Sequence, residues 1–271
     1  MKKVVLSVLA ALAVSAAPAF AADMPVKAKM AAPVYVSPWD VAFGTAFTTD
    51  YRLRGISQSN KKPAVQGYFE GRYNVNDMIQ LYAGLWGSSL YGGFADAEFD
   101  ISGGARFTLN NFGLDVGYVY YGYPEGSVNG VGSFGDFYAK PSYKFNDWLT
   151  VGAIVDYGNN NNNGIGIVGS KDEGYYSANA VVTLPWSPAG IAISLNPEIG
   201  RQWAKCTGCT SFTYWDVGLD FAYKAVTLDL RYWDTRAHGV FFSPVAYGLK
   251  DLGGSTFVAT LKFDTTLMAL K

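Results

Sequence analysis

The stretch AEFDISGGARF, residues 97–107, decides between two fold classes for this chain. Its odd positions carry no polar side chain, whereas its even positions hold charged, hydroxylated or small residues. Because side chains alternate between the two faces of a strand, the segment has one apolar face and one ionic face. A soluble sandwich would bury the apolar face. A transmembrane β-barrel instead turns the apolar face toward lipid and the ionic face toward a wet interior.

The same alternation recurs in about eleven further segments, the first over residues 40–54 and the last over residues 255–263. The predicted connections alternate between tight turns, such as Asn110-Asn111, and longer loops. This asymmetry is typical of outer-membrane barrels, which have an even number of strands. The prediction is therefore all-β, an antiparallel transmembrane β-barrel of about 12 strands over residues 39–263. Its first and last strands should pair, because an open edge leaves backbone groups unbonded in hydrocarbon.

The tryptophans near the predicted strand ends match two aromatic girdles at the lipid interfaces. The expected girdles consist of Trp39, Trp148 and Trp186 on the side of the tight turns, and of Trp86, Trp203 and Trp215 on the side of the long loops.

The N-terminal residues have the pattern of a secretory signal. Lys2 and Lys3 precede an apolar run, residues 4–17, and a small-x-small motif ends at Ala21. The run is short for a membrane-spanning helix, so we expect cleavage and export to the bacterial outer membrane. The predicted segments are a signal peptide (1–21), a periplasmic lead-in (22–38), the barrel (39–263) and a C-terminal tail (264–271).

The composition argues against a nucleic-acid partner. The chain has 21 Lys plus Arg and 22 Asp plus Glu, and loss of Lys2 and Lys3 leaves 19 against 22, a net charge near −3. Nucleic-acid binding requires a basic face, which this balance does not provide. Beyond the signal, no segment approaches the roughly 18 consecutive apolar residues of a membrane helix.

The ionic face of the predicted strands defines the expected pore lining, with eleven acids and eight bases. Because rings of charge bias the sign of permeating ions, this excess predicts a mild preference for cations. The expected pore-lining residues are Asp50, Arg52, Arg54, Glu70, Arg72, Glu98, Asp100, Arg106, Asp115, Asp136, Lys140, Lys144, Asp156, Glu198, Asp216, Asp220, Asp229, Arg231 and Lys262.

Two short motifs carry a resemblance to a known family. RGISQS at residues 54–59, followed by KPAVQG at residues 62–67, resembles the TorF family of porin-like proteins, also described as a conserved Gly/Cys/Trp-rich bacterial outer-membrane family. The resemblance implies an outer-membrane barrel and a channel without an established substrate, and it brings no catalytic or ligand residue. Such barrels usually end on an aromatic residue of the last strand, whereas this chain continues past Phe263.

Three functions are open from the sequence. The first is a passive outer-membrane pore for small solutes and ions, since about twelve strands lie between filled and open barrels. The second is a closed structural, adhesion or binding barrel, in which the mixed charges pair across the lumen. The third is a lipid hydrolase built around the single histidine, His238, beside Arg236 and near Ser243.

The remaining expectations concern partners and cysteines. A barrel of this class would contact membrane lipid and lipopolysaccharide, pass through the outer-membrane assembly machinery and meet small solutes in its lumen. No cofactor or metal set is expected, because a zinc site needs about four ligands. Cys206 and Cys209 flank a tight loop, and in an exported chain both a disulfide and two free thiols remain open.

Overall fold

The computed structural model describes residues 37–91, 95–124, 133–158, 172–205, 211–236 and 251–270. The expected signal peptide, residues 1–21, lies outside the described residues. The strands are β1 (Trp39–Thr48), β2 (Arg52–Leu53), β3 (Ile56–Ser57), β4 (Ala64–Asn74), β5 (Ile79–Ser89), β6 (Ala97–Leu109), β7 (Phe112–Gly122), β8 (Phe134–Lys144), β9 (Leu149–Gly158), β10 (Asp172–Thr183), β11 (Ala192–Lys205), β12 (Phe212–Tyr223), β13 (Val226–Thr235) and β14 (Thr256–Thr266).

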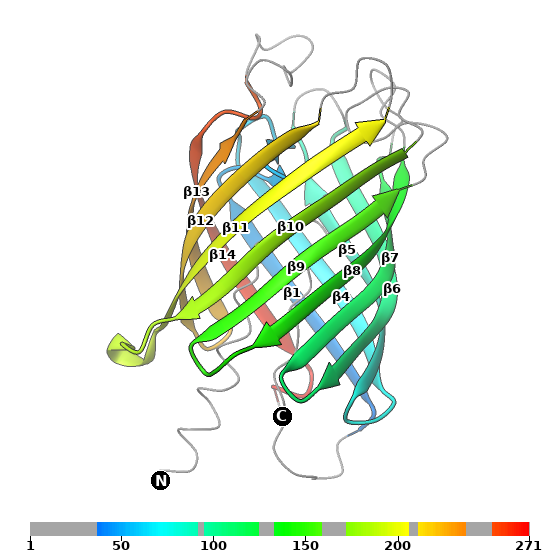
Figure 1. The fold of residues 1–271 in the computed structure, drawn as a ribbon, viewed down its shortest axis with the longest axis vertical. Coiled ribbons are helices and arrows are strands. Elements are labelled where there is room, and N and C mark those ends of the chain that lie inside the picture. Colours follow the sequence, from blue (N-terminus) through cyan, green and yellow to red (C-terminus); the bar gives the residue numbers. More distant parts are fainter. Residues whose placement is uncertain are drawn as a thin grey trace.

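Twelve of these strands form one closed antiparallel barrel, in which each strand from β4 to β13 pairs with the next strand in the chain (Figure 1). β1 closes the sheet, because it pairs with β4 on one side and with β14 on the other. Closure gives the backbone groups of both end strands a partner, as hydrocarbon requires. The predicted fold class and the pairing of first and last strands are confirmed.

The connections differ between the two ends of the barrel (Figure 1). One end, here called the turn end, has short connections such as Asn110-Asn111 and Lys224-Ala225. The β10–β11 connection at this end contains a 3₁₀ turn, Pro188–Gly190. The other end, here called the loop end, has the longer connections, including residues 49–63 between β1 and β4.

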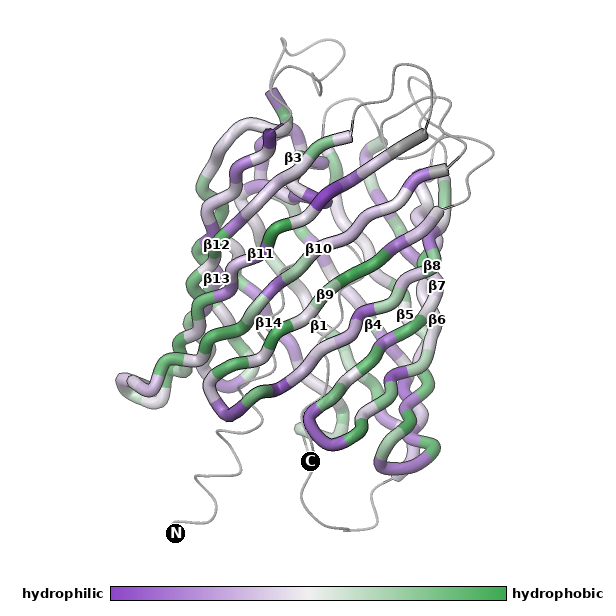
Figure 2. The backbone as a smooth tube through the Cα atoms, viewed as in Figure 1, coloured by the Kyte–Doolittle hydropathy of each residue, from purple (hydrophilic) through white to green (hydrophobic). Residues whose placement is uncertain are grey.

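The polarity of the barrel wall is that of a transmembrane barrel. On β6, Phe99 and Ile101 are 57% and 58% exposed, whereas Glu98 and Asp100 are 0% and 1% exposed. Figure 2 shows the same alternation of hydrophobic and hydrophilic residues along the other strands. The charged residues at alternate strand positions are buried and therefore face the inside of the barrel. The aliphatic and aromatic residues between them face outward. Among the described residues, no helix is long and apolar enough to cross a membrane.

Most of the predicted tryptophan positions are confirmed. Trp39, Trp148 and Trp186 are exposed near the turn end, and Trp215 is exposed on β12. The prediction for Trp86 was wrong. Trp86 has the inward parity of β5 and packs with the buried cluster in the lumen, because its position alternates with that of exposed Leu85.

Two predicted strand ends were also wrong. β1 ends at Thr48 and not at residue 54, because residues 49–63 leave the wall and enter the lumen. Asp50 and Arg52 alternate with apolar residues, and this alternation led to the wrong prediction that the wall strand continues to residue 54. At the other end, β14 runs to Thr266, so that residues 264–266 of the expected tail pair with β1.

The outward face can be tested at Leu230, which is 46% exposed near the middle of β13. We expect Leu230→Lys to lower the free energy of unfolding by roughly 2–4 kcal/mol, since a lipid-facing cation near the bilayer centre costs this much. Reversible unfolding in lipid vesicles, monitored by tryptophan fluorescence, measures the change, with Leu230→Ile as the control. Equal stability of the two variants would contradict an outward, lipid-facing Leu230.

Candidate functional site

The connection between β1 and β4 occupies part of the lumen at the loop end. Its two short strands, β2 and β3, form a hairpin in which Leu53 pairs with Ile56. The two residues of the turn, Arg54 and Gly55, have φ angles of 50° and 82°. This pattern is that of a type I′ turn, which suits a two-residue hairpin. A Cβ atom on Gly55 would also lie 2.6 Å from Tyr214 of β12, so glycine is required here.

Arg54 at the tip of this hairpin reaches the far side of the barrel. Its Nη2 lies 2.8 Å from Asp136 of β8 and 2.9 Å from Asp156 of β9. Its Nη1 donates to Gln202 of β11 at 2.9 Å, and its guanidinium carbon is 4.7 Å from the ring centre of Tyr175. The hairpin therefore crosses the lumen and is tethered to three wall strands.

The base of the hairpin is fixed by Asp50. Its carboxylate accepts hydrogen bonds from Ser57 Oγ at 2.5 Å and Ser59 Oγ at 3.2 Å, and it pairs with Arg52 Nε at 2.9 Å. Arg52 also donates to the backbone oxygens of Gly55 and Gly254. The motif RGISQS, residues 54–59, thus supplies the turn, the cross-lumen tether and the hydroxyl groups that hold the connection inside the barrel.

A second charged cluster is centred on Arg106 of β6. Arg106 Nη2 lies 2.7 Å from Glu70, and its Nε lies 3.1 Å from Asp115. Its guanidinium carbon is 3.9 Å from the ring centre of Tyr82, whose hydroxyl donates to Asp115 at 2.6 Å. Glu70 also pairs with Arg72. All five side chains are buried in the interior.

A third cluster is centred on Arg231 of β13. Arg231 pairs with Asp216 of β12 and lies 3.4 Å from Asp229. Its guanidinium carbon is 6.0 Å from the ring centre of Trp233, and Lys262 Nζ is 3.0 Å from Asp229. In each of these three clusters, the central arginine pairs with at least one carboxylate from another strand.

The structure puts most of the expected lining residues on the inner face of the wall, and three on the inward-folded connection. Those on the wall are Glu70, Arg72, Glu98, Asp100, Arg106, Asp115, Asp136, Lys140, Asp156, Glu198, Asp216, Asp220, Asp229, Arg231 and Lys262. Those on the connection are Asp50, Arg52 and Arg54. Lys144 is different, because it lies exposed at the turn end and pairs with Asp147 at 2.8 Å.

Sequence reasoning missed two buried carboxylates, Asp40 and Glu173, the second of which lies at the start of β10. With Glu173 and Asp40 included, the described buried charged residues comprise twelve carboxylates and six cations. The acidic excess in the lumen is therefore larger than the sequence count suggested.

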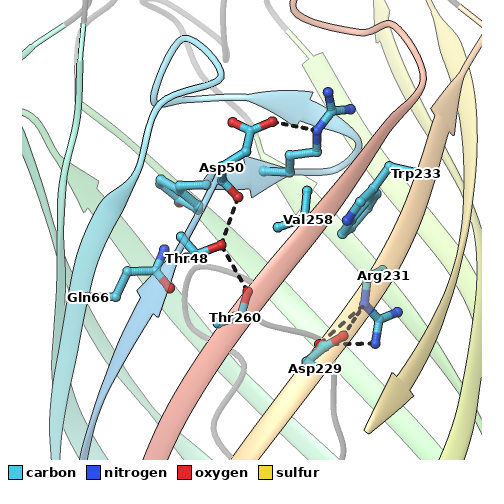
Figure 3. Close-up of a pocket in the computed structure, with 10 residues that line it drawn as sticks. Thr48, Asp50, Gln66, Asp229, Arg231, Trp233, Val258 and Thr260 are labelled. Carbon is cyan, nitrogen blue, oxygen red and sulfur yellow. Dashed lines mark hydrogen bonds and ion pairs between the residues drawn. The ribbon is translucent and has the colours of Figure 1, made fainter.

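A small pocket lies between the connection and the wall formed by β1, β4, β13 and β14 (Figure 3). Its lining combines hydroxyl, amide and charged groups with the ring of Trp233. Thr260 Oγ1 donates to Thr48 Oγ1 at 2.9 Å, and Thr48 Oγ1 donates to the backbone oxygen of Asp50. These bonds join the connection to the strands that close the barrel.

Several expected features fall outside the described residues, namely Cys206, Cys209, His238 and Ser243. Neither the disulfide question nor the hydrolase hypothesis is therefore tested. Within the described part of the chain, no group of three or more His, Cys, Asp or Glu side chains could hold a metal ion.

The closed sheet, the apolar exterior and the ionic interior define a transmembrane β-barrel of the outer-membrane type. The chain belongs to the Gcw_chp family, described as bacterial proteins of unknown function, whose model matches residues 32–264. In the comparison with curated proteins, no sequence matches this chain.

Solved structures resemble the barrel at low sequence identity. One, from "Unveiling the Mechanism Behind the in-meso Crystallization of Membrane Proteins", has 9% identity and a TM-score of 0.54, and the match covers 85% of this chain and 84% of that one. The NanC porin has 10% identity and a TM-score of 0.49 over 84% and 98% of the two chains. The COG4313 outer membrane channel from Pseudomonas putida F1 has 11% identity and a TM-score of 0.49 over 88% and 98%. Similarity at this level concerns the fold alone.

The buried clusters should contribute to stability through pairing. We expect Arg106→Ala to lower the free energy of unfolding by about 3–5 kcal/mol, because Glu70 and Asp115 would be left buried without their cation. Lys144→Ala, which removes the exposed partner of Asp147, should leave it unchanged. Urea unfolding of both variants in the same vesicles checks this. Similar losses in the two would argue against a buried, paired Arg106.

Proposed function

We propose that this protein is an outer-membrane channel that passes small solutes and ions by passive diffusion, with a preference for cations. The observation that carries the proposal is the ionic lumen, in which twelve buried carboxylates outnumber six buried cations. A net negative lining lowers the barrier for cations and raises it for anions. The porin activity that the TorF resemblance implies is part of this proposal. The proposal also includes export by the N-terminal signal and a loop end that faces the cell exterior.

The hairpin of β2 and β3 makes this a narrow channel. A barrel of about twelve strands has a lumen between the filled interior of eight-stranded barrels and the open one of 16–18-stranded porins. Arg54 extends across this lumen to Asp136 and Asp156, and Arg52 is bonded to the connection before β14. The hairpin therefore serves as the constriction, and passage occurs beside it or after its displacement.

The channel is tested in planar bilayers by single-channel conductance and reversal potential. We expect small conductance steps and, in a KCl gradient, a reversal potential of the sign given by cation-selective pores, because the lining is acidic. A control porin in the same bilayers establishes that the conditions detect conductance. Absence of steps under those conditions would refute the channel, and an anion-selective potential would refute the stated preference.

The role of the hairpin is tested by Arg54→Ser. The variant loses the tether to β8 and β9 and also leaves two carboxylates without their cation. We expect larger conductance and stronger cation selectivity than in the wild type. Arg201→Ser serves as the control, because Arg201 is exposed on the outward parity of β11 and should not affect the lumen. Unchanged conductance in Arg54→Ser would mean that the hairpin is not the constriction.

The second candidate is a closed barrel with a structural or binding role. It is favoured by the pairing of Arg54, Arg106 and Arg231 with carboxylates inside the lumen. Liposome swelling in a small sugar separates the two candidates, because a closed barrel passes no sugar while an open channel does.

A further inference from the structure

The three lumenal arginines share one environment. Arg54, Arg106 and Arg231 each lie between two carboxylates of the interior and near the face of an aromatic ring. This arrangement is favourable because the guanidinium donates to both carboxylates, while its weakly hydrated face contacts the ring. The interior of the barrel is thus suited to planar organic cations at three separate places.

A fourth pair of carboxylates has the same surroundings without an arginine. Glu98 and Asp100 are neighbours on the inner face of β6 and are 0% and 1% exposed. Trp86 of β5 and Tyr121 of β7 are the strand partners of Asp100, and the ring of Tyr51 is centred 5.4 Å from that of Trp86. Two carboxylates and three aromatic side chains therefore meet at one position in the half of the lumen nearer the loop end.

No described residue supplies a cation to this pair. Glu98 Oε1 accepts a hydrogen bond from Tyr51 at 3.3 Å, and the hydroxyl of Tyr123 also interacts with Glu98. Both oxygens of Asp100 are buried and accept no hydrogen bond from a described donor group. Burial of carboxylates without compensation costs several kcal/mol per ion. Such a pair is compensated either by a proton that the two carboxyls share or by a cation that enters the lumen.

The chemistry of the site favours an organic cation over a metal ion. A calcium ion takes six to eight oxygen ligands, whereas this position offers two carboxylates among aromatic rings. A guanidinium or alkylammonium group instead brings several N–H donors for the carboxylates and binds well over aromatic faces. These are also the properties of the arginines that occupy the three comparable positions.

We propose that Glu98 and Asp100, with Tyr51, Trp86 and Tyr121, form a binding site for the guanidinium or ammonium group of a small organic cation. The proposal names a substrate class for the channel, and it rests on the proposed function for the route by which the ligand arrives. Tyr51 covers the carboxylates from the inward-folded connection. Because that residue lies outside the barrel strands, its side chain can move aside without breaking the wall.

The site is tested by isothermal titration calorimetry of the full chain in detergent. Methylguanidinium is the probe, and N-methylurea, which has a similar shape and no charge, is the matched control ligand. We expect one methylguanidinium per chain and no uptake of N-methylurea. The double variant Glu98→Gln/Asp100→Asn should bind methylguanidinium roughly tenfold or more weakly, since two charge-assisted hydrogen bonds are lost.

Asp220→Asn is the control variant, because Asp220 on β12 is also buried and its oxygens also lack a hydrogen-bond partner among the described residues. It should retain wild-type affinity. Circular dichroism verifies that each variant is folded. If the double variant does not fold, Glu98→Gln and Asp100→Asn alone, together with the two probes on the wild type, decide the question.

Four results would overturn the proposal. They are equal binding of N-methylurea, unchanged affinity in the folded Glu98 and Asp100 variants, binding of K⁺ or Ca²⁺ in place of methylguanidinium, and no binding of any probe. If one of these results is obtained, infrared spectroscopy identifies the alternative. A protonated-carboxyl band that is present in the wild type and absent in the double variant would show that Glu98 and Asp100 share a proton. Because calorimetry needs no current, a protein that binds methylguanidinium but gives no conductance would refute the channel and retain the site.

Discussion

The requirement that every backbone N–H and C=O finds a partner controls this structure. In hydrocarbon no water can take the place of a missing partner, so a sheet that crosses the membrane must close. Closure here depends on β1, which bonds to β4 along one edge and to β14 along the other. Residues 264–266 extend that second seam with polar side chains, which shows that pairing and not hydrophobicity determines where the barrel ends.

Closure also determines where the charged side chains lie. Since each strand alternates, a closed sheet with an apolar exterior has all its ionic residues in one narrow interior. Twelve buried carboxylates and six buried cations would repel or be poorly solvated there unless they are paired. Arg106 and Arg231, which lie on wall strands, pair with carboxylates of the wall. Arg54 comes from the β1–β4 connection and reaches across the lumen to pair with Asp136.

The wall was predictable from the sequence because its signal is local and periodic. Apolar and charged residues alternate along β6, as Phe99 and Ile101 do with Glu98 and Asp100. A strand places such alternating residues on opposite faces of the sheet. The inward-folded connection was not predictable in this way. Arg52 and Arg54 continue the alternation of β1, and only contacts with residues far along the chain, such as Asp136, distinguish a hairpin in the lumen from a strand in the wall.

The motif of residues 54–59 illustrates how a local sequence can encode a long-range constraint. Gly55 is needed for the positive φ of the turn and for its close approach to Tyr214, and Arg54 needs that turn to reach the far wall. Ser57 and Ser59 donate hydrogen bonds to Asp50, and these bonds hold the base of the same hairpin. Each residue is thus restricted by the geometry of the lumen and not by strand propensity. Tyr51, at the start of the same connection, is held inside the barrel in the same way and donates a hydrogen bond to Glu98, which neighbours the buried Asp100.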